Sequence, residues 1–249
     1  MRKSPSIAIA AGLLVALAGV TPAQAHDGDN DRRSDGASRT AKLSVLHAVP
    51  GLTVDVYVDG ALTLDNFEPG SLAGPLALPA GTYSVAITAA DAVDASSPVI
   101  GPVDLRLKRG KNYTAVAHLT EAGAPTATLF ANDTRRVKRG DGRLTVRHVA
   151  AAPAVDVLAN GAAAITGLTN PHEAKLKLPA GTYSAAVAAA GTTAPLIGPA
   201  DVTVAKGTNT IVYAWGSLEG NSLALAVQTV PLRQSYGDRH GDSRDRDDS

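Results

Sequence analysis

The sequence predicts an all-β fold: two tandem immunoglobulin-like β-sandwich domains with disordered polar tails. Two observations lead to this fold class. The first is a duplication, because the seven residues LPAGTYS occur at 78–84 and again at 178–184. The second is a succession of short runs in which apolar and polar residues alternate, separated by turn residues, which is typical of sandwiches and barrels.

The first 25 residues have the layout of a secretory signal peptide. Two basic residues at positions 2 and 3 precede an apolar run over 7–20, and the small-residue pattern AQA at 23–25 offers a cleavage site. The apolar run is too short for a membrane-spanning helix. We therefore expect cleavage after Ala25 and a secreted, extracellular protein without a membrane span.

Two polar segments flank the repeated region, at 26–41 and 233–249. Both are rich in Asp, Arg, Ser and Gly and contain almost nothing to bury, so we expect them to be disordered. The chain carries 23 basic and 23 acidic residues, and the signal segment holds two of the basic ones. The mature protein is therefore slightly acidic, which gives no reason to expect nucleic acid as a partner.

Three pairs of blocks align between the halves of the chain, and the small length differences fall between the blocks. Deletions in loops and matches in strands indicate two copies of one domain. We expect the first β-sandwich domain over 42–132, a basic linker over 133–142 and the second domain over 143–232. The aligned pairs are 43–60 with 144–161, 76–87 with 176–187, and 98–117 with 195–214.

Within a copy, the alternation predicts about seven strands, although the order of the strands in the sheets is not readable. Val54, Val56 and Val58 share one face of such a strand, and Asp55 points to the other. The stretch LPAG has Pro and Gly at the second and fourth positions of a type I turn that leads into the next strand. The repeated positions around this turn are expected to be structural: Gly81, Tyr83, Gly181 and Tyr183.

Together, the blocks LHA…VDVYVDG, LPAGTYSVAI and RGKNYTAVA resemble the bacterial domain of unknown function family 4397. The resemblance covers nearly all of 43–131 and, more loosely, 143–230. The second copy departs from it at Leu158, Asn160 and Thr210. The resemblance implies export, a β-rich fold and tandem occurrence, and it implies no activity.

A His–Asp pair recurs in both copies, as His47 with Asp55 and His148 with Asp156. Such a pair suggests catalysis, but strand parity directs the two side chains to different faces. We expect instead that each His bonds a loop carbonyl and that each Asp braces a turn. The alternative function is an extracellular hydrolase that uses His47 or His148 with loop carboxylates.

The strand near the end of the second copy carries an apolar stripe on its outward face: Ile211, Tyr213 and Trp215. An aromatic stripe on an outer face is typical of a contact surface, so these residues are the candidate interaction face. The alternatives are that the stripe packs against the first domain or a covering loop, or that the two faces of the strand are reversed.

The sequence contains no nucleophile or phosphate-binding motif, no cysteine, and no histidines at metal-ligand spacing. We therefore assign no catalytic, cofactor-binding or metal-binding residue and expect no cofactor. The predicted function is a secreted, non-enzymatic binding or structural module at the cell exterior. Its partner is unknown, with a cell-wall polymer or an extracellular protein as the candidates, and its oligomeric state is also unknown.

Overall fold

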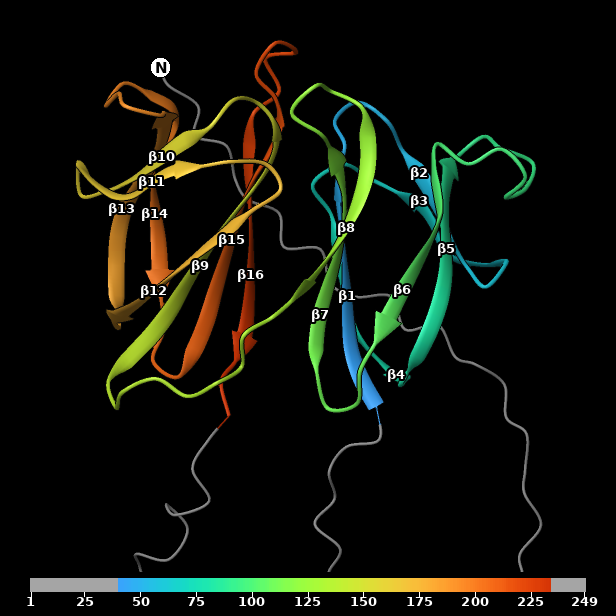
Figure 1. Cartoon of the computed structure of the whole chain (residues 1–249), viewed down its shortest axis with the longest axis horizontal. Coiled ribbons are helices and arrows are strands. Elements are labelled where there is room, and N and C mark those ends of the chain that lie inside the picture. Colours follow the sequence, from blue (N-terminus) through green and yellow to red (C-terminus); the bar gives the residue numbers. More distant parts are fainter. Residues whose placement is uncertain (1–39, 234–249) are drawn as a thin grey trace, which may run out of the picture. The chain divides into compact units, whose positions relative to one another are not determined.

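The computed structural model describes residues 40–233, which form sixteen β-strands connected by turns and loops (Figure 1). These residues fall within one compact unit. The predicted signal peptide and most of both predicted tails lie outside the described residues. Two boundaries differ from the prediction: residues 40–41 of the predicted polar segment belong to the first strand, and residues 141–142 of the predicted linker belong to the first strand of the second copy. The described residues include no helix long and apolar enough to cross a membrane.

Each copy contributes eight strands, one more than the sequence predicted. The first copy consists of β1 (Thr40–Ala48), β2 (Val54–Val58), β3 (Ala61–Phe67), β4 (Leu72–Pro79), β5 (Gly81–Ala89), β6 (Ile100–Leu107), β7 (Asn112–Leu119) and β8 (Pro125–Ala131). The second consists of β9 (Asp141–Ala151), β10 (Val155–Ala159), β11 (Ala162–Leu168), β12 (Glu173–Pro179), β13 (Gly181–Ala189), β14 (Pro195–Val204), β15 (Thr208–Ser217) and β16 (Ala224–Pro231).

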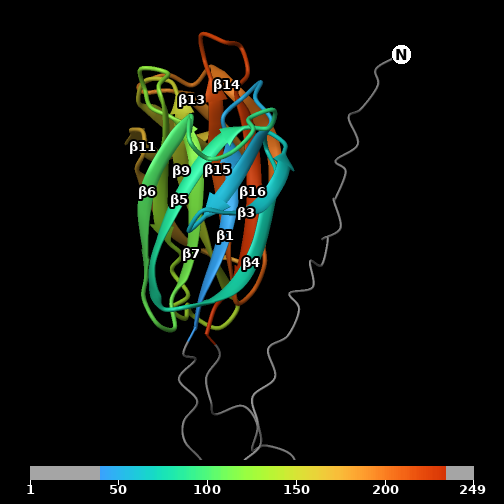
Figure 2. The same ribbon diagram turned by 90° about the vertical axis from the view of Figure 1, so that its right-hand side faces the viewer.

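The eight strands of each copy form two four-stranded sheets. In the first copy the orders are β4-β1-β7-β8 and β3-β2-β5-β6, and strands β3, β5 and β6 of the latter face the viewer in Figure 2. The second copy repeats both orders as β12-β9-β15-β16 and β11-β10-β13-β14. Within each copy one pair is parallel, β1 with β7 and β9 with β15, and every other pair is antiparallel. The all-β fold and the tandem arrangement are confirmed.

The immunoglobulin-like strand order is not confirmed. In a constant-type immunoglobulin sandwich the first and second strands share a sheet. Here β1 and β2 lie in different sheets, and β1 pairs with β4 and β7. In the first copy β8 extends its sheet beyond β7, and in the second copy β16 extends the corresponding sheet beyond β15.

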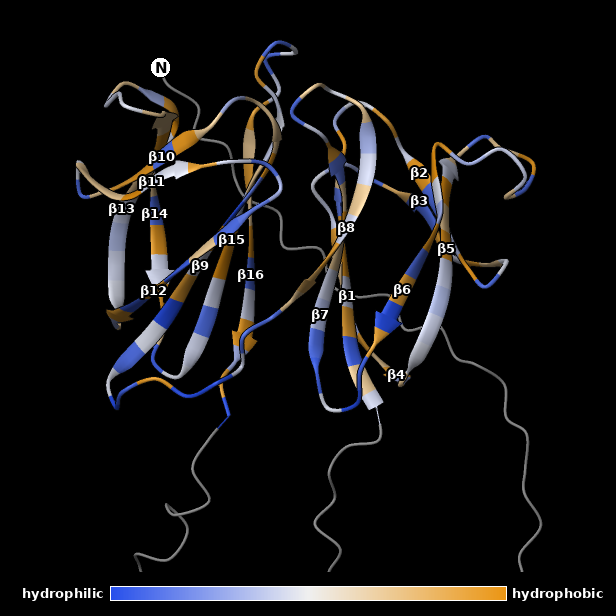
Figure 3. Ribbon diagram, in the orientation of Figure 1, coloured by the Kyte–Doolittle hydropathy of each residue, from blue (hydrophilic) through white to orange (hydrophobic). Residues whose placement is uncertain are grey.

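Alternation of apolar and polar residues places one face of each central strand between the two sheets of a copy. Bands of opposite hydropathy follow one another along β9 (Figure 3). Val54 and Val56 pack in the core of the first copy with Ile87, and Val155 and Val157 pack in the corresponding core of the second. The face assignment made from the sequence therefore holds for β2 and β10.

Candidate functional site

The predicted interaction face lies in the contact between the two copies. Ile211 and Tyr213 are fully buried, and Trp215 is partly buried against the same cluster. The stripe is therefore covered by the first domain, which is one of the alternatives that the sequence left open, and it is not an exposed surface for a partner. The buried members of this interface cluster are Leu46, Ala48, Val116 and Phe130 of the first copy and Val149, Ile211, Tyr213 and Val230 of the second.

Trp215 contacts the turn between β3 and β4 of the first copy. A Cβ built on Gly70 in that turn would lie 3.0 Å from Cζ2 of the indole, so any side chain there would require the ring or the turn to shift by a few tenths of an ångström. Gly70 also has a φ of +79°, in the left-handed region that glycine enters without steric cost. The turn and the tryptophan are thus matched in shape across the contact.

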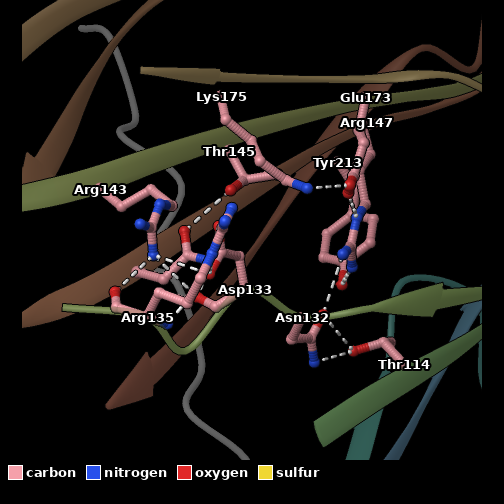
Figure 4. A network of polar contacts seen from close by, with 11 residues as sticks. Thr114, Asn132, Asp133, Arg135, Arg143, Thr145, Arg147, Glu173, Lys175 and Tyr213 are labelled. Atoms are coloured by element: carbon pink, nitrogen blue, oxygen red, sulfur yellow. Dashed lines mark hydrogen bonds and ion pairs between the residues drawn. The ribbon is translucent and has the colours of Figure 1, made fainter. Parts of the chain in front are cut away.

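Arg147 is the central polar residue of the contact, and its side chain is fully buried (Figure 4). Its guanidinium uses all three nitrogens: Nη1 donates to the Tyr213 hydroxyl at 2.7 Å, Nη2 donates to Asn132 Oδ1 at 2.9 Å, and Nε donates to Glu173 Oε2 at 2.9 Å. A buried charge is tolerated only when it is paired and hydrogen-bonded, and the Glu173 carboxylate supplies the counter-charge.

Two aromatic rings flank the same guanidinium. Its Cζ lies 4.3 Å from the centroid of Phe130, which belongs to the first copy, and 5.3 Å from that of Tyr213, which belongs to the second. Aromatic faces attract cations, most strongly where water is excluded. Arg147 is therefore held by side chains of both copies and joins β9 to β8 and β15.

The hydrogen-bond network continues from Tyr213 back into the first copy. The Tyr213 hydroxyl donates to Gln228 Oε1 at 2.7 Å, and the Thr114 hydroxyl donates to the same oxygen at 2.9 Å. Asn132 Nδ2 donates to Thr114 Oγ1 at 3.0 Å. Burial raises the pKa of Tyr213, and the nearby Arg147 charge opposes this rise. The phenol therefore stays protonated at neutral pH and keeps its role as a donor.

Residues 132–140, between β8 and β9, form no strand, and hydrogen bonds join part of this segment to the second copy. The guanidinium of Arg143, itself buried, donates through Nη1 to the carbonyls of Asp133 and Arg135 at 3.0 and 2.9 Å. Asn209 Nδ2 donates to the Asp133 carbonyl at 3.2 Å. Hydrogen bonds from Arg135, helped by the charge of Arg143, lower the pKa of the Asp133 carboxyl to about 2.

His47 and His148 have the structural role that was predicted for them. His47 Nε2–H donates to the Leu52 carbonyl at 2.6 Å, and His148 Nε2–H donates to the Pro153 carbonyl at 3.0 Å. Both rings are buried. Burial lowers the pKa of each ring, against the effect of the backbone hydrogen bond, so both are neutral near pH 7.

Asp55 and Asp156 brace turns and do not pair with these histidines. Asp55 Oδ1 accepts from the Asn66 amide at 2.8 Å, and Asp156 accepts from the amides of Gly167 and Gly191, each at 2.8 Å. The described residues thus hold no His47–Asp55 or His148–Asp156 dyad, and nothing in their geometry supports the hydrolase alternative.

The repeated LPAGTYS stretch forms the same corner in both copies. The Tyr83 hydroxyl donates to the Pro79 carbonyl at 2.9 Å, and the Tyr183 hydroxyl donates to the Pro179 carbonyl at 2.8 Å. The ring of Tyr83 also lies in van der Waals reach of Gly81, 3.8 Å from where a Cβ would stand, and Gly181 has the same relation to Tyr183. All four repeat positions thus take part in the same corner of their copy.

Sequence reasoning missed two further polar residues: Asn170, which bonds across the contact between the copies, and His118, whose hydrogen bonds stay within the first copy. Asn170 of the β11–β12 loop donates through Nδ2 to the carbonyl of Leu119 in the first copy, at 2.8 Å, and to that of Ala150 at 2.6 Å. His118 is fully buried, donates through Nδ1–H to the Leu119 carbonyl at 2.8 Å, and accepts from the Thr128 hydroxyl at 2.9 Å. Burial lowers its pKa, and the neighbouring His148 adds to this effect.

Within residues 40–233, no three His, Asp or Glu side chains come together as a possible metal-ligand set. The arrangement of polar side chains described above can stabilise and orient two sandwiches, but it presents no group of them that converges on a cavity.

Comparison with known proteins identifies one family. A family model described as a domain of unknown function, DUF4397, matches residues 41–158 and 149–236. These two regions together cover both sandwiches. No curated protein matches the chain.

Proposed function

Because the chain belongs to the DUF4397 family, whose description states no activity, we propose its function from the arrangement of its residues. The protein is a secreted, non-enzymatic binding or structural module that acts at the cell exterior. Export is inferred from the signal-peptide pattern of residues 1–25.

The observation that carries the proposal is how the polar side chains are used. The residues that a catalyst would need, His47 and Asp55 with their repeats, bond to backbone groups of turns and loops. The buried charge of Arg147 is engaged by Glu173 and by aromatic rings. Such use favours a rigid scaffold over a reactive centre.

A rigid scaffold of this kind would act by display. The first copy exposes three leucines on its edge strands, Leu62 on β3 and Leu72 and Leu76 on β4, with exposed fractions of 50%, 39% and 43%. At the corresponding positions of β11 and β12, the second copy has Ala163 and Glu173 in place of the first two. Exposed apolar side chains can mark a contact surface, so we assign binding to this edge of the first copy.

The proposal is tested by capture of the mature protein, residues 26–249, on intact cell envelope and on its purified polymers. Leu76→Lys would be measured beside the unchanged protein. Saturable retention that this substitution weakens about tenfold or more would support a binding module that uses the β3–β4 edge.

Leu196→Lys is the matched control, because Leu196 lies on β14 of the second copy and is 40% exposed. It introduces the same charge at the same exposure and should leave retention unchanged. Absence of retention on every envelope fraction would contradict a role at the envelope. Equal loss in both variants would contradict the assignment to the β3–β4 edge.

A further inference from the structure

A cavity of about 200 Å³ lies between the two sheets of the first copy, at the edge formed by β3 and β4. Its walls are aliphatic and come from four strands. They include Leu43 and Val45 of β1, Val56 and Val58 of β2, and Leu76 and Leu78 of β4. Leu76 is 43% exposed, so the cavity reaches the surface at this strand.

The chemistry of the walls selects an uncharged ligand. No charged side chain lines the cavity, and the one hydroxyl, that of Thr63, donates to the Ala61 carbonyl at 3.1 Å. An apolar cavity of about 150 Å³ is known to stay dry and to bind benzene. The cavity in the first copy is larger, and a water inside it would find too few polar partners.

The second copy differs from the first at the equivalent edge. Strand β4 has eight residues where β12 has seven, and the pairing of β1 with β4 shifts register between Leu43 and Val45. The pairing of β9 with β12 is regular, and there Leu176 packs against the core. Beside the bulge in β4 the equivalent Leu76 is 43% exposed, more than the half-buried Leu176, so it fills less of the space between the sheets.

The edge of β4 is poorly suited to pairing with another strand. Pro75 stands in the middle of β4 and has no amide proton to donate, and the bulge further disturbs the edge. The equivalent strand β12 is protected differently, by the charges of Lys175 and Lys177. A ligand at the β3–β4 edge is thus expected to bind in the space between the sheets and not by pairing with the backbone of β4.

We propose that this cavity binds the unbranched aliphatic tail of a single-chain amphiphile, with the polar end of the ligand in solvent beside Leu76. The inference rests on the proposed role of the protein as a binding module and names the class of ligand. An unbranched chain fits a cavity with aliphatic walls that is entered between two strands, and it requires no counter-charge there.

The test uses the mature protein with methyl-labelled Leu and Val and follows its NMR spectrum during titration with 1-butanol, 1-hexanol and 1-octanol. Methyl groups of the cavity, such as those of Val56 and Leu78, should shift saturably. Their counterparts in the second copy, Val157 and Leu178, serve as an internal control and should not. Affinity should rise about fourfold for each added methylene until the cavity is full.

Ala73→Leu places extra volume in the cavity, since Ala73 is one of its lining residues. It should weaken 1-octanol binding about tenfold or more. Ala77→Leu is the matched control: it makes the same change on the same strand at an exposed position that does not line the cavity, and it should not alter binding. The chain-length series needs no variant and still decides the question if Ala73→Leu does not fold.

Three results would overturn the proposal. One is shifts of equal size in both copies, or no shifts. Another is tighter binding of p-xylene than of 1-octanol, which would assign the cavity to an aromatic ligand. The third is a change in the methyl signals of β3 and β4 with protein concentration in the absence of ligand, which would indicate that another molecule of the protein covers this edge. Retained capture on envelope without alkanol binding would remove only the ligand class, whereas alkanol binding without capture would remove only the envelope role.

Discussion

The two copies share their strand order but use the same outer face differently. On the strands that meet, the first copy has Leu46 and Val116 where the second has Arg147 and Tyr213. Residues inside each sandwich stay alike by comparison, as His47 and His148 do. A duplicated domain can thus keep its interior and change the face through which its copies meet, because interior packing constrains volume more tightly than a face that acquires a new neighbour.

Of the substitutions that test this difference, Arg147→Ala should have the largest effect on stability. The substitution leaves the buried oxygens of Asn132 and Tyr213 without their donor and removes the group stacked on Phe130. We expect the free energy of unfolding to fall by about 3–5 kcal/mol. Denaturant titration followed by the fluorescence of Trp215, the one tryptophan of the chain, would measure it.

Arg147→Leu is the control, because it gives the second copy the residue that the first has as Leu46. An apolar side chain of similar volume should restore part of the lost stability. A loss below about 1 kcal/mol for Arg147→Ala would contradict the view that this guanidinium holds the copies together.

The second test concerns the positions that the copies keep in common. His47→Ala removes the hydrogen bond to the Leu52 carbonyl inside the first copy, and we expect a loss of about 1–3 kcal/mol. His172→Ala, at an exposed position, is the control and should change stability little.

The same variant tests a pH dependence. Burial lowers the pKa of His47 in the folded protein below its ordinary value of 6.5. As the pH falls below about 6.5, the unfolded chain therefore binds more protons than the folded one, and the free energy of unfolding decreases. His118 and His148 act in the same direction. His47→Ala should make this decrease shallower, and an unchanged slope would contradict a neutral, buried ring.

The third test separates backbone strain from the fit between the copies at Gly70. Gly70→Ala and Gly60→Ala place a side chain at nearly the same φ, +79° and +80°. The new Cβ at Gly60 meets nothing within 4 Å, whereas at Gly70 it meets Trp215. We expect Gly60→Ala to cost about 1 kcal/mol and Gly70→Ala to cost about 1–2 kcal/mol more, with a change in the Trp215 emission spectrum. Equal losses would show that the indole moves aside freely.

Much of this fold could be predicted from the sequence because it depends on local patterns. The alternation of Val54, Val56 and Val58 identifies a strand and its inner face, and the repeated LPAGTYS stretch identifies a corner. The hydrogen bonds of His47 and Asp55 to nearby backbone groups were also predicted from the sequence. Strand parity separates the two side chains, and the loop or turn next to each one supplies its bonding partner.

The strand order and the contact between the copies could not be predicted in the same way. The parallel pairing of β1 with β7 joins segments far apart in the chain and leaves no local pattern. The partners of Arg147 come from three separate segments, at Asn132, Glu173 and Tyr213. One signal was present in the aligned repeats: a charged residue, Arg147, stands where the first copy has the apolar Leu46.

The smallest expected effect concerns the edge strands, where the copies differ by single exposed residues. Lys177 on β12 corresponds to Ala77 on β4, since each pairs with the matching position of the neighbouring strand. Exchanging them one at a time, as Lys177→Ala and Ala77→Lys, should change the free energy of unfolding by less than about 0.5 kcal/mol. Their effects on self-association should differ, because the proline of β12, Pro179, is its last residue and leaves the interior of that edge undisturbed, whereas β4 has Pro75 in its interior. Sedimentation velocity over a range of concentrations should show increased association for Lys177→Ala and none added or removed by Ala77→Lys. If Lys177→Ala sediments as the unchanged protein does, the charge of Lys177 is not what protects the edge of β12.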